Sequence, residues 1–176
     1  DMSVRAVLGS AAFFDPDLHG QVDGTLAKRS PGSALKPFIY GLAIDQGLIH
    51  PRSVLKDAPT AFGPYSPENF DGAFVGPIDA TQALIRSRNV PAVALASRLQ
   101  PPGFHGFLRA GGVARLASAE HYGLALVLGG GEVTMAEMLR LYALLPNRGR
   151  LRALRYLQGD AESADGAPLL SPAASF

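Results

Sequence analysis

The sequence predicts a mixed α+β domain, with apolar helices in its central part and short strands near its two ends. Its 176 residues fall near the commonest size of a single domain. Hydrophobic residues make up 47% of the chain and charged residues 18%, which excludes a disordered segment. Apolar positions recur with helical spacing in several segments between residues 33 and 145, and the strand-like segments lie on either side.

The first third of the chain is expected to hold one strand and one buried helix. Val4–Leu8 is apolar and stops at a glycine, which predicts a short strand. From Ser33 onward, apolar residues recur every three or four positions until Gly47, so that Ser33 lies at a helix N-terminus. Proline and glycine then recur through residues 50–78, which favours extended segments and loops over helix.

Two further helices are predicted from their starting residues. Asp79 and Gln82 have the spacing of a capping box, which predicts a short helix ending near Arg86. Asn89 can cap the next helix, which residues 100–103, Gln-Pro-Pro-Gly, should terminate. The Ser-Arg-Asn break between these helices can therefore face a cleft.

The last third is predicted to contain a helix followed by a strand. Thr134 and Glu137 form a capping box at the start of a periodic helix that runs through Leu145. Leu151–Leu157 alternates enough to be a strand. The glycine run at residues 129–131 lacks the following lysine of a phosphate-binding loop, so we expect a turn.

Composition excludes several classes of function. Sixteen basic and fifteen acidic residues leave a formal charge of +1, so nucleic acid is not an expected partner. The absence of cysteine removes disulfides and thiolate nucleophiles, and the four histidines are too scattered for a metal site. No cofactor motif is present. No apolar run approaches the roughly 18 residues needed to cross a bilayer, so we expect any membrane anchor to lie outside these residues.

Ser33 and Lys36 are three residues apart at the start of a predicted helix. A serine hydroxyl becomes a nucleophile when a base takes its proton, and a lysine with a lowered pKa can be that base. Ser53 and Lys56 share the spacing, but they lie in a segment without helical period. A simpler interpretation remains open, in which Ser33 only caps the helix and Lys36 is a solvated lysine.

Ser87-Arg88-Asn89 is the second candidate motif, placed at the break between two predicted helices. The simpler interpretation is again that Asn89 is a helix cap. With the motif around Ser33, this segment carries a resemblance to a known family. The stretches RSPGSALKPFIYGLA and YSPENFDGAFVGPIDATQALIRSRNVPAVAL resemble the transpeptidase domain of class A penicillin-binding proteins, as do VRAVLGSAAFF and LGGGEVTMAEMLRLYALLPNRG.

The resemblance covers most of the chain and implies both fold and domain organisation. It implies the α+β fold shared by serine β-lactamases and D,D-peptidases, with helices packed on an antiparallel sheet that is largely missing here. Residues 1–176 would then be a partial transpeptidase domain, without a glycosyltransferase domain and without the C-terminal Lys-Thr-Gly part. Residues 65–76 would form a loop on the wall of the cleft.

The resemblance also implies the chemistry and its location. Ser33 would be the acylated nucleophile and Lys36 its general base or proton relay, while Ser87 would shuttle a proton and Asn89 would position substrate. The reaction implied is attack on the D-Ala-D-Ala carbonyl of a peptidoglycan stem peptide, followed by transfer to an amine of a neighbouring strand. β-Lactam antibiotics would acylate the same serine, on the periplasmic side of the bacterial inner membrane.

One departure from the family pattern affects the expected activity. No Lys-Thr-Gly occurs in the sequence, and the last lysine is Lys56. In the family, the strand that carries Lys-Thr-Gly supplies an oxyanion donor. Loss of such a donor costs about a hundredfold or more in rate, so this chain alone should be a poor catalyst. Two alternatives therefore stay open. One is a D,D-carboxypeptidase or β-lactamase with water as acceptor, and the other is a non-catalytic module that binds muropeptide or β-lactam.

Overall fold

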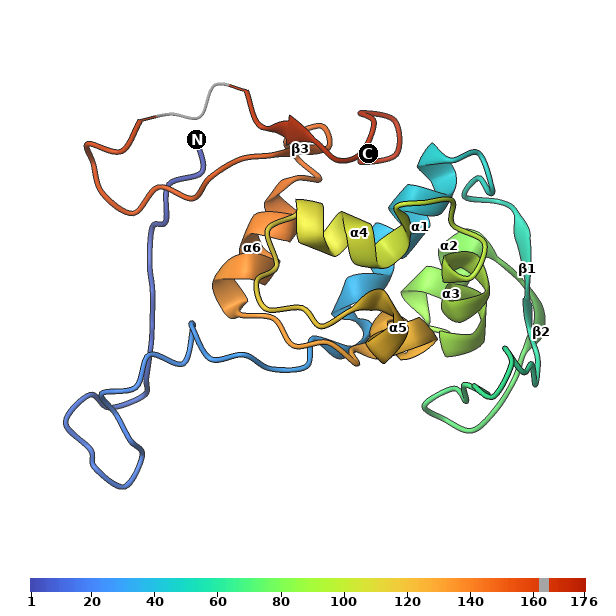
Figure 1. The fold of residues 1–176 in the computed structure, drawn as a ribbon, viewed down its shortest axis with the longest axis horizontal. Coiled ribbons are helices and arrows are strands. Elements are labelled where there is room, and N and C mark those ends of the chain that lie inside the picture. The colour runs from blue at the N-terminus through green and yellow to red at the C-terminus, as the bar shows by residue number, and fades with distance from the viewer. Residues whose placement is uncertain (162–164) are drawn as a thin grey trace.

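The computed structural model describes residues 1–161 and 165–176, and Figure 1 shows their fold. The strands come in two consecutive pairs with a run of helices between them, in agreement with the mixed α+β prediction. The α-helices are α1 Lys36–Asp45, α2 Ala80–Ile85, α3 Asn89–Ala96, α4 Gly103–Ala110, α5 Ala119–Tyr122 and α6 Met135–Ala143. The 3-10 helices are η1 Gly32–Leu35 and η2 Gly123–Leu128. The strands are β1 Val54–Asp57, β2 Gly76–Asp79, β3 Arg150–Leu151 and β4 Ala167–Pro168.

Helix α1 forms the centre of the core. It lies between the α2–α3 pair and α6, with α4 across it (Figure 1). Phe38 and Ile39 of α1 are fully buried, and the Phe38 ring contacts Phe107 of α4 and Tyr142 of α6 at 5.6 and 5.1 Å between ring centroids. A helix that is apolar on all sides is stable only when other elements cover it. The first residues of α1 are therefore held firmly, and the candidate site lies there.

The two sheets are small. Strands β1 and β2 pair antiparallel, from Val54 opposite Asp79 to Asp57 opposite Gly76, and lie beside α2 and α3 (Figure 1). Strands β3 and β4 form a second antiparallel pair near the C-terminus. The long loop that joins β1 to β2 returns toward α3, where it reaches the candidate site.

The helices that begin with a local capping signal are confirmed. Asp79 Oδ1 accepts a hydrogen bond from the Gln82 backbone N–H at 2.8 Å, at the start of α2. Thr134 Oγ1 accepts from the Glu137 N–H and Glu137 Oε2 accepts from the Thr134 N–H, so the capping box of α6 is complete. The buried helix that follows Ser33 is also present.

Four of the predictions were wrong. Val4–Leu8 forms no strand, because only Ser3 bridges to another segment and the side chains around Leu8 are exposed. Within Leu151–Leu157 only the first residue belongs to a strand. Asn89 is the first residue of α3 and does not cap it. Residues 100–103 do not end the preceding helix, because α3 stops at Ala96 and α4 begins at Gly103.

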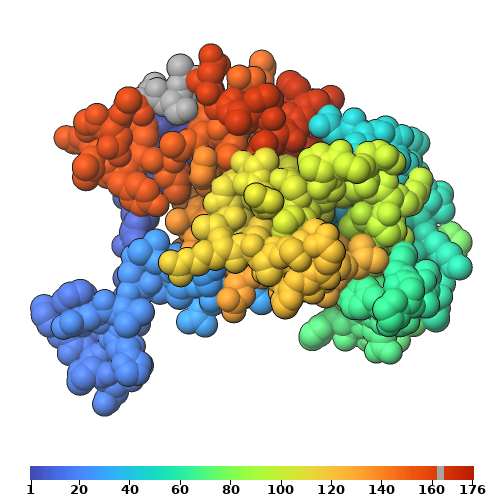
Figure 2. All heavy atoms as spheres, in the orientation of Figure 1, coloured from blue at the N-terminus to red at the C-terminus, as the bar shows by residue number. Residues whose placement is uncertain are grey.

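The N-terminal residues form a loop that stands out from the body of the molecule (Figures 1 and 2). Several of its apolar side chains are exposed, among them Phe14 and Leu18. Among the described residues, none of the helices has the length and apolar character to cross a membrane.

Candidate active site

Ser33 and Lys36 lie on one side of a tight turn that leads into α1. Gly32 has a positive φ of 53°, which lets the chain turn sharply into η1. The Lys36 backbone N–H donates to the Ser33 carbonyl. Because a 3-10 helix has three residues per turn, side chains three apart project in the same direction. The three-residue spacing of Ser33 and Lys36 thus places both side chains on the same face of the turn.

The two simpler interpretations of these residues are wrong. Ser33 lies inside η1 and not at its N-cap, which is Pro31. Lys36 is only 1% exposed, so it is not a solvated lysine. A buried ammonium group is costly unless oxygens surround it, so its surroundings need an explanation.

Three oxygens from the Ser87–Asn89 segment surround the Lys36 amine. Nζ donates to Asn89 Oδ1 at 2.6 Å, to the Ser87 carbonyl at 2.5 Å and to Ser87 Oγ at 3.1 Å. These bonds occupy all three hydrogens of an ammonium group. They join residues 51 and 53 positions apart in the chain. The structure therefore brings both candidate motifs together at one nitrogen.

Burial, and after it the positive charge of Arg88, together lower the pKa of the Lys36 amine to about 8. An ordinary lysine has a pKa near 10.5 and is almost entirely protonated at neutral pH. At Lys36 a neutral amine is accessible close to neutral pH. This is the property that a general base needs.

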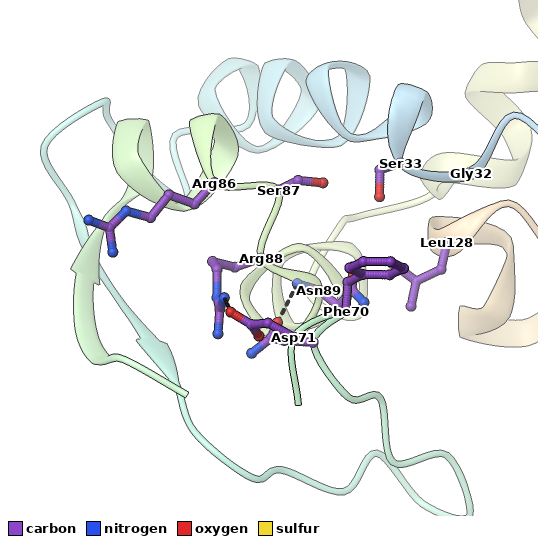
Figure 3. Close-up of a pocket in the computed structure, with 10 residues that line it drawn as sticks. Gly32, Ser33, Phe70, Asp71, Arg86, Ser87, Arg88, Asn89 and Leu128 are labelled. Atoms are coloured by element: carbon purple, nitrogen blue, oxygen red, sulfur yellow. Dashed lines mark hydrogen bonds and ion pairs between the residues drawn. The ribbon is translucent and has the colours of Figure 1, made fainter. Parts of the chain in front are cut away.

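Ser33 and the Ser87–Asn89 segment face a common cleft of about 450 Å³. The Ser33 and Ser87 side chains point into it, and the Ser87 hydroxyl is directed toward the Ser33 side (Figure 3). Phe70 stands at its edge with its ring fully exposed. The loop of residues 65–76 thus contributes to the cleft wall, as the resemblance implied. The lining residues are Gly32, Ser33, Asn69, Phe70, Asp71, Arg86, Ser87, Arg88, Asn89 and Leu128.

The Ser-Arg-Asn segment has a strained backbone. Ser87 has a φ of 54°, in the left-handed region that favours glycine. The Ser87 and Asn89 side chains both accept from Lys36 Nζ. The Arg88 side chain extends toward Asp71 instead (Figure 3). Backbone strain persists only where surrounding contacts hold it.

A buried network behind this segment was missed by the sequence analysis. Arg88 Nε donates to Asp57 Oδ2 at 2.7 Å, and Asp57 is fully buried. Asn69 Nδ2 donates to Asp57 Oδ1 at 2.7 Å, and the Asn89 backbone N–H donates to Asn69 Oδ1 at 2.8 Å. The side chains that bond Asp57 lie 12 and 31 residues away in the chain, so no local motif joins them. The one local sign of this network is a carboxylate at the end of an extended segment.

Gly129 packs directly against the Ser33 turn. Its carbonyl accepts a hydrogen bond from Ser30 Oγ at 2.7 Å. A Cβ atom at Gly129 would lie 2.5 Å from the Gly32 backbone nitrogen, and Gly129 also has a φ of 92°. The sequence analysis expected only a turn here. The glycine permits the close approach of η2 to η1 that keeps Ser33 in place.

Comparison with known proteins identifies the family. The family model described as penicillin binding protein transpeptidase domain matches residues 21–169. Penicillin-binding protein 1C of Escherichia coli is 42% identical over 100% of this chain, which covers 23% of that protein. Penicillin-binding protein 1A of Pseudomonas aeruginosa is 30% identical over 94% of the chain and 20% of that protein. The chain thus spans less than a quarter of the length of either relative.

Solved structures agree in fold. Penicillin-binding protein PonA1 of Mycobacterium tuberculosis superposes with a TM-score of 0.72 and 22% identity, over 87% of this chain and 46% of that one. The TP domain of Burkholderia pseudomallei penicillin-binding protein 3 gives a TM-score of 0.74 and 17% identity, over 87% of this chain and 52% of that one. The fold is therefore that of these domains, with only short sheets among the residues that the structure describes. The family model and the identity to these relatives show that the chain belongs to the penicillin-binding protein transpeptidase family.

Proposed function

We propose that this chain carries the acylation site of a peptidoglycan D,D-transpeptidase, with Ser33 as the nucleophile. The observation that carries the proposal is the buried Lys36 amine, which bonds Ser87 Oγ and Asn89 Oδ1 beside a cleft lined by Ser33. Membership of the transpeptidase family supports the substrate, a stem peptide ending in D-Ala-D-Ala.

In the first step the neutral Lys36 amine takes the Ser33 hydroxyl proton, and Oγ forms a bond to the D-alanyl carbonyl carbon. The carbonyl oxygen becomes an oxyanion, for which the Ser33 backbone N–H is a donor. The amide C–N bond then breaks, and terminal D-alanine leaves with a proton. Ser87 Oγ passes that proton from Lys36 to the leaving nitrogen, a role supported by its hydrogen bond of 3.1 Å to Lys36 Nζ.

In the second step an amine of a neighbouring stem peptide attacks the Ser33 ester. A new amide bond forms, the ester C–O bond breaks, and the proton lost by the amine returns to Ser33 Oγ. An acyl-enzyme divides one difficult amide exchange into two easier steps. A β-lactam would acylate the same oxygen when its ring amide opens.

Asn89 has a second role to offer besides holding Lys36. Its Nδ2 donates one hydrogen to the Glu68 carbonyl at 2.6 Å. An amide nitrogen has two hydrogens, so one is left to bind a substrate carbonyl at the cleft. We assign substrate positioning to this hydrogen. The site would act on the periplasmic side of the inner membrane, with any membrane anchor outside this chain.

The proposal is tested by the intact mass of the full-length protein after incubation with benzylpenicillin. We expect an added mass equal to one penicillin in the native protein and none in Ser33→Ala. A folded native protein that forms no adduct would overturn the serine mechanism and favour a non-catalytic binding module.

A second assay separates transfer from hydrolysis. With a D-Ala-D-Ala peptide and an added D-amino acid, a transpeptidase exchanges the terminal residue. A D,D-carboxypeptidase would instead release the shortened peptide as the free acid, whatever the concentration of the added amine.

A further inference from the structure

The buried ion pair between Arg88 and Asp57 requires an explanation. Asp57 is fully buried and both of its oxygens are occupied: Oδ1 accepts from Asn69, and Oδ2 accepts from Arg88 Nε and from the Val75 N–H at 3.1 Å. Arg88 is also buried. Removing two charges from water costs about as much as their attraction returns, so such a pair is weak evidence for a stabilising role. What the pair does provide is a fixed geometry.

Arg88 is the middle residue of the Ser-Arg-Asn segment, so holding its side chain holds both neighbours. Its guanidinium donates to Asp57 on one side and to Asp71 Oδ2, at 2.8 Å, on the other, and it also donates to the Ala73 carbonyl. A planar guanidinium with three partners has little freedom. Ser87 is thereby kept in its left-handed conformation, in which its carbonyl meets Lys36.

A second path runs from Asp57 to Asn89 through Asn69. Asn69 Nδ2 donates to Asp57, which leaves Asn69 Oδ1 to accept the Asn89 backbone N–H at 2.8 Å. The Asn89 amide then donates to the Glu68 carbonyl, so that its own oxygen faces Lys36. The Asp57 carboxylate thus fixes the orientation of the Asn69 amide. Through the bond from the Asn89 N–H, Asn69 in turn fixes the position of Asn89.

We propose that Asp57, Asn69 and Arg88 form a positioning unit for acylation, which holds the Ser87–Asn89 segment so that its oxygens meet the Lys36 amine. The proposal rests on the proposed function, because it assigns these residues a role in the acylation of Ser33. None of the three is a catalytic residue, since each acts through Ser87 or Asn89.

The test is the kinetics of acylation of the full-length protein by a fluorescent penicillin. In Asp57→Asn, either the bond to Asn69 or the bond to Arg88 is lost, because an amide cannot accept at both positions. We expect the limiting rate constant to fall about tenfold to a hundredfold, as small misplacements of reacting groups do. The half-saturating penicillin concentration should change less than about threefold, because the residue does not touch the ligand.

The rate constant separates positioning from folding. A first-order rate constant does not depend on the fraction of folded protein, whereas the final amount of adduct does. A variant that labels to a lower final amount at the native rate would contradict the proposal. Asp71→Asn is the matched comparison, since Asp71 also pairs with Arg88 but is exposed and not bonded to Asn69. Its rate constant should fall several-fold less than that of Asp57→Asn.

Exchange of the Asp57 and Asn69 side chains should restore part of the lost acylation rate. Asn69→Asp alone places two carboxylates against each other, whereas Asp57→Asn with Asn69→Asp restores one donor and one acceptor between the positions. We expect the double variant to be acylated faster than either single variant. A double variant no faster than the slower single variant would overturn the proposal. Failure of the native protein to form an adduct would overturn the proposed function instead.

Discussion

At Lys36, burial and a neighbouring positive charge act in the same direction on the amine. Each disfavours the ammonium form, and three oxygens compensate for part of that cost. A base with a pKa near the working pH is the one that transfers protons most effectively. The buried Lys36 amine is therefore suited to proton transfer, but it contributes little to the free energy of folding, because a buried charge is costly.

The pKa of Lys36 predicts how acylation depends on pH. If the neutral amine is the base, the acylation rate constant of the full-length protein rises about tenfold per pH unit below pH 8 and levels off above it. The sign follows because lower pH protonates the amine. Stopped-flow labelling with a fluorescent penicillin from pH 6 to 10 measures this profile. A rate constant independent of pH between 6 and 8 would exclude Lys36 as the base.

Ser87 allows the hydroxyl and the backbone strain to be separated. Its left-handed φ costs a residue with a Cβ atom about 1 kcal/mol relative to glycine. We therefore expect Ser87→Gly to be more stable than Ser87→Ala by roughly that amount in chemical denaturation. Both variants lack the hydroxyl, so both should be acylated equally slowly. Full activity in either one would show that Ser87 Oγ does not carry a proton.

The close approach of η2 to η1 holds the turn that carries Ser33 in place. Tyr142 of α6 adds to this support, because its hydroxyl donates to the Ala34 carbonyl at 2.8 Å. The turn that carries Ser33 is thus fixed from two elements far along the chain. Neither contact follows from any local pattern.

Gly129→Ala should damage this arrangement. The added Cβ atom would meet backbone atoms of Gly32, and a positive φ is unfavourable for alanine. We expect a loss of about 2 kcal/mol or more in the free energy of unfolding, with slower acylation. Gly159→Ala is the matched control, because a Cβ atom there meets nothing within 4 Å and its φ is not positive. Equal stability of the two variants in denaturant titrations would contradict the close packing of η1 and η2.

The helices could be predicted where their start signals are local. The cap bond of Asp79 and the capping box of Thr134 join residues three apart, so sequence alone specifies them. Strands of two residues depend on partners elsewhere, as Arg150 depends on Pro168. The sequence does not predict α4, because the prolines ahead of it indicate the end of a helix, whereas Gly103 begins one.

In the candidate site, too, the residues of short sequence motifs could be predicted, whereas residues that depend on distant partners could not. Ser33, Lys36, Ser87 and Asn89 could be proposed from two short motifs, and the structure brings Lys36 together with the last two. The spacing of the motifs does not reveal the distance between them. Asp57 and Asn69 belong to no motif, because their importance comes from burial and from partners in other elements.

The two sides of the candidate cleft come from segments far apart in the sequence. The 3-10 helix η1, which leads into α1, forms one side, and residues 87–89 form the other. The sequence contains no Lys-Thr-Gly to provide the second oxyanion donor that the resemblance implies. We therefore expect the 176-residue chain by itself to be acylated about a hundredfold more slowly than a longer form of the protein that supplies such a donor. Labelling both with the same fluorescent penicillin checks this, and equal rate constants would mean that the donor is dispensable.

Peptide mapping of the penicilloyl adduct tests the central claim most directly. Ser53 and Lys56 repeat the spacing of Ser33 and Lys36, but Lys56 is exposed and Ser53 Oγ accepts from the His50 N–H. Tandem mass spectrometry of the digested, penicillin-treated protein should place the added mass on Ser33 alone. Mass on Ser53 or on any other residue, with Ser33 unmodified, would contradict the assignment of the nucleophile and of the cleft around Lys36.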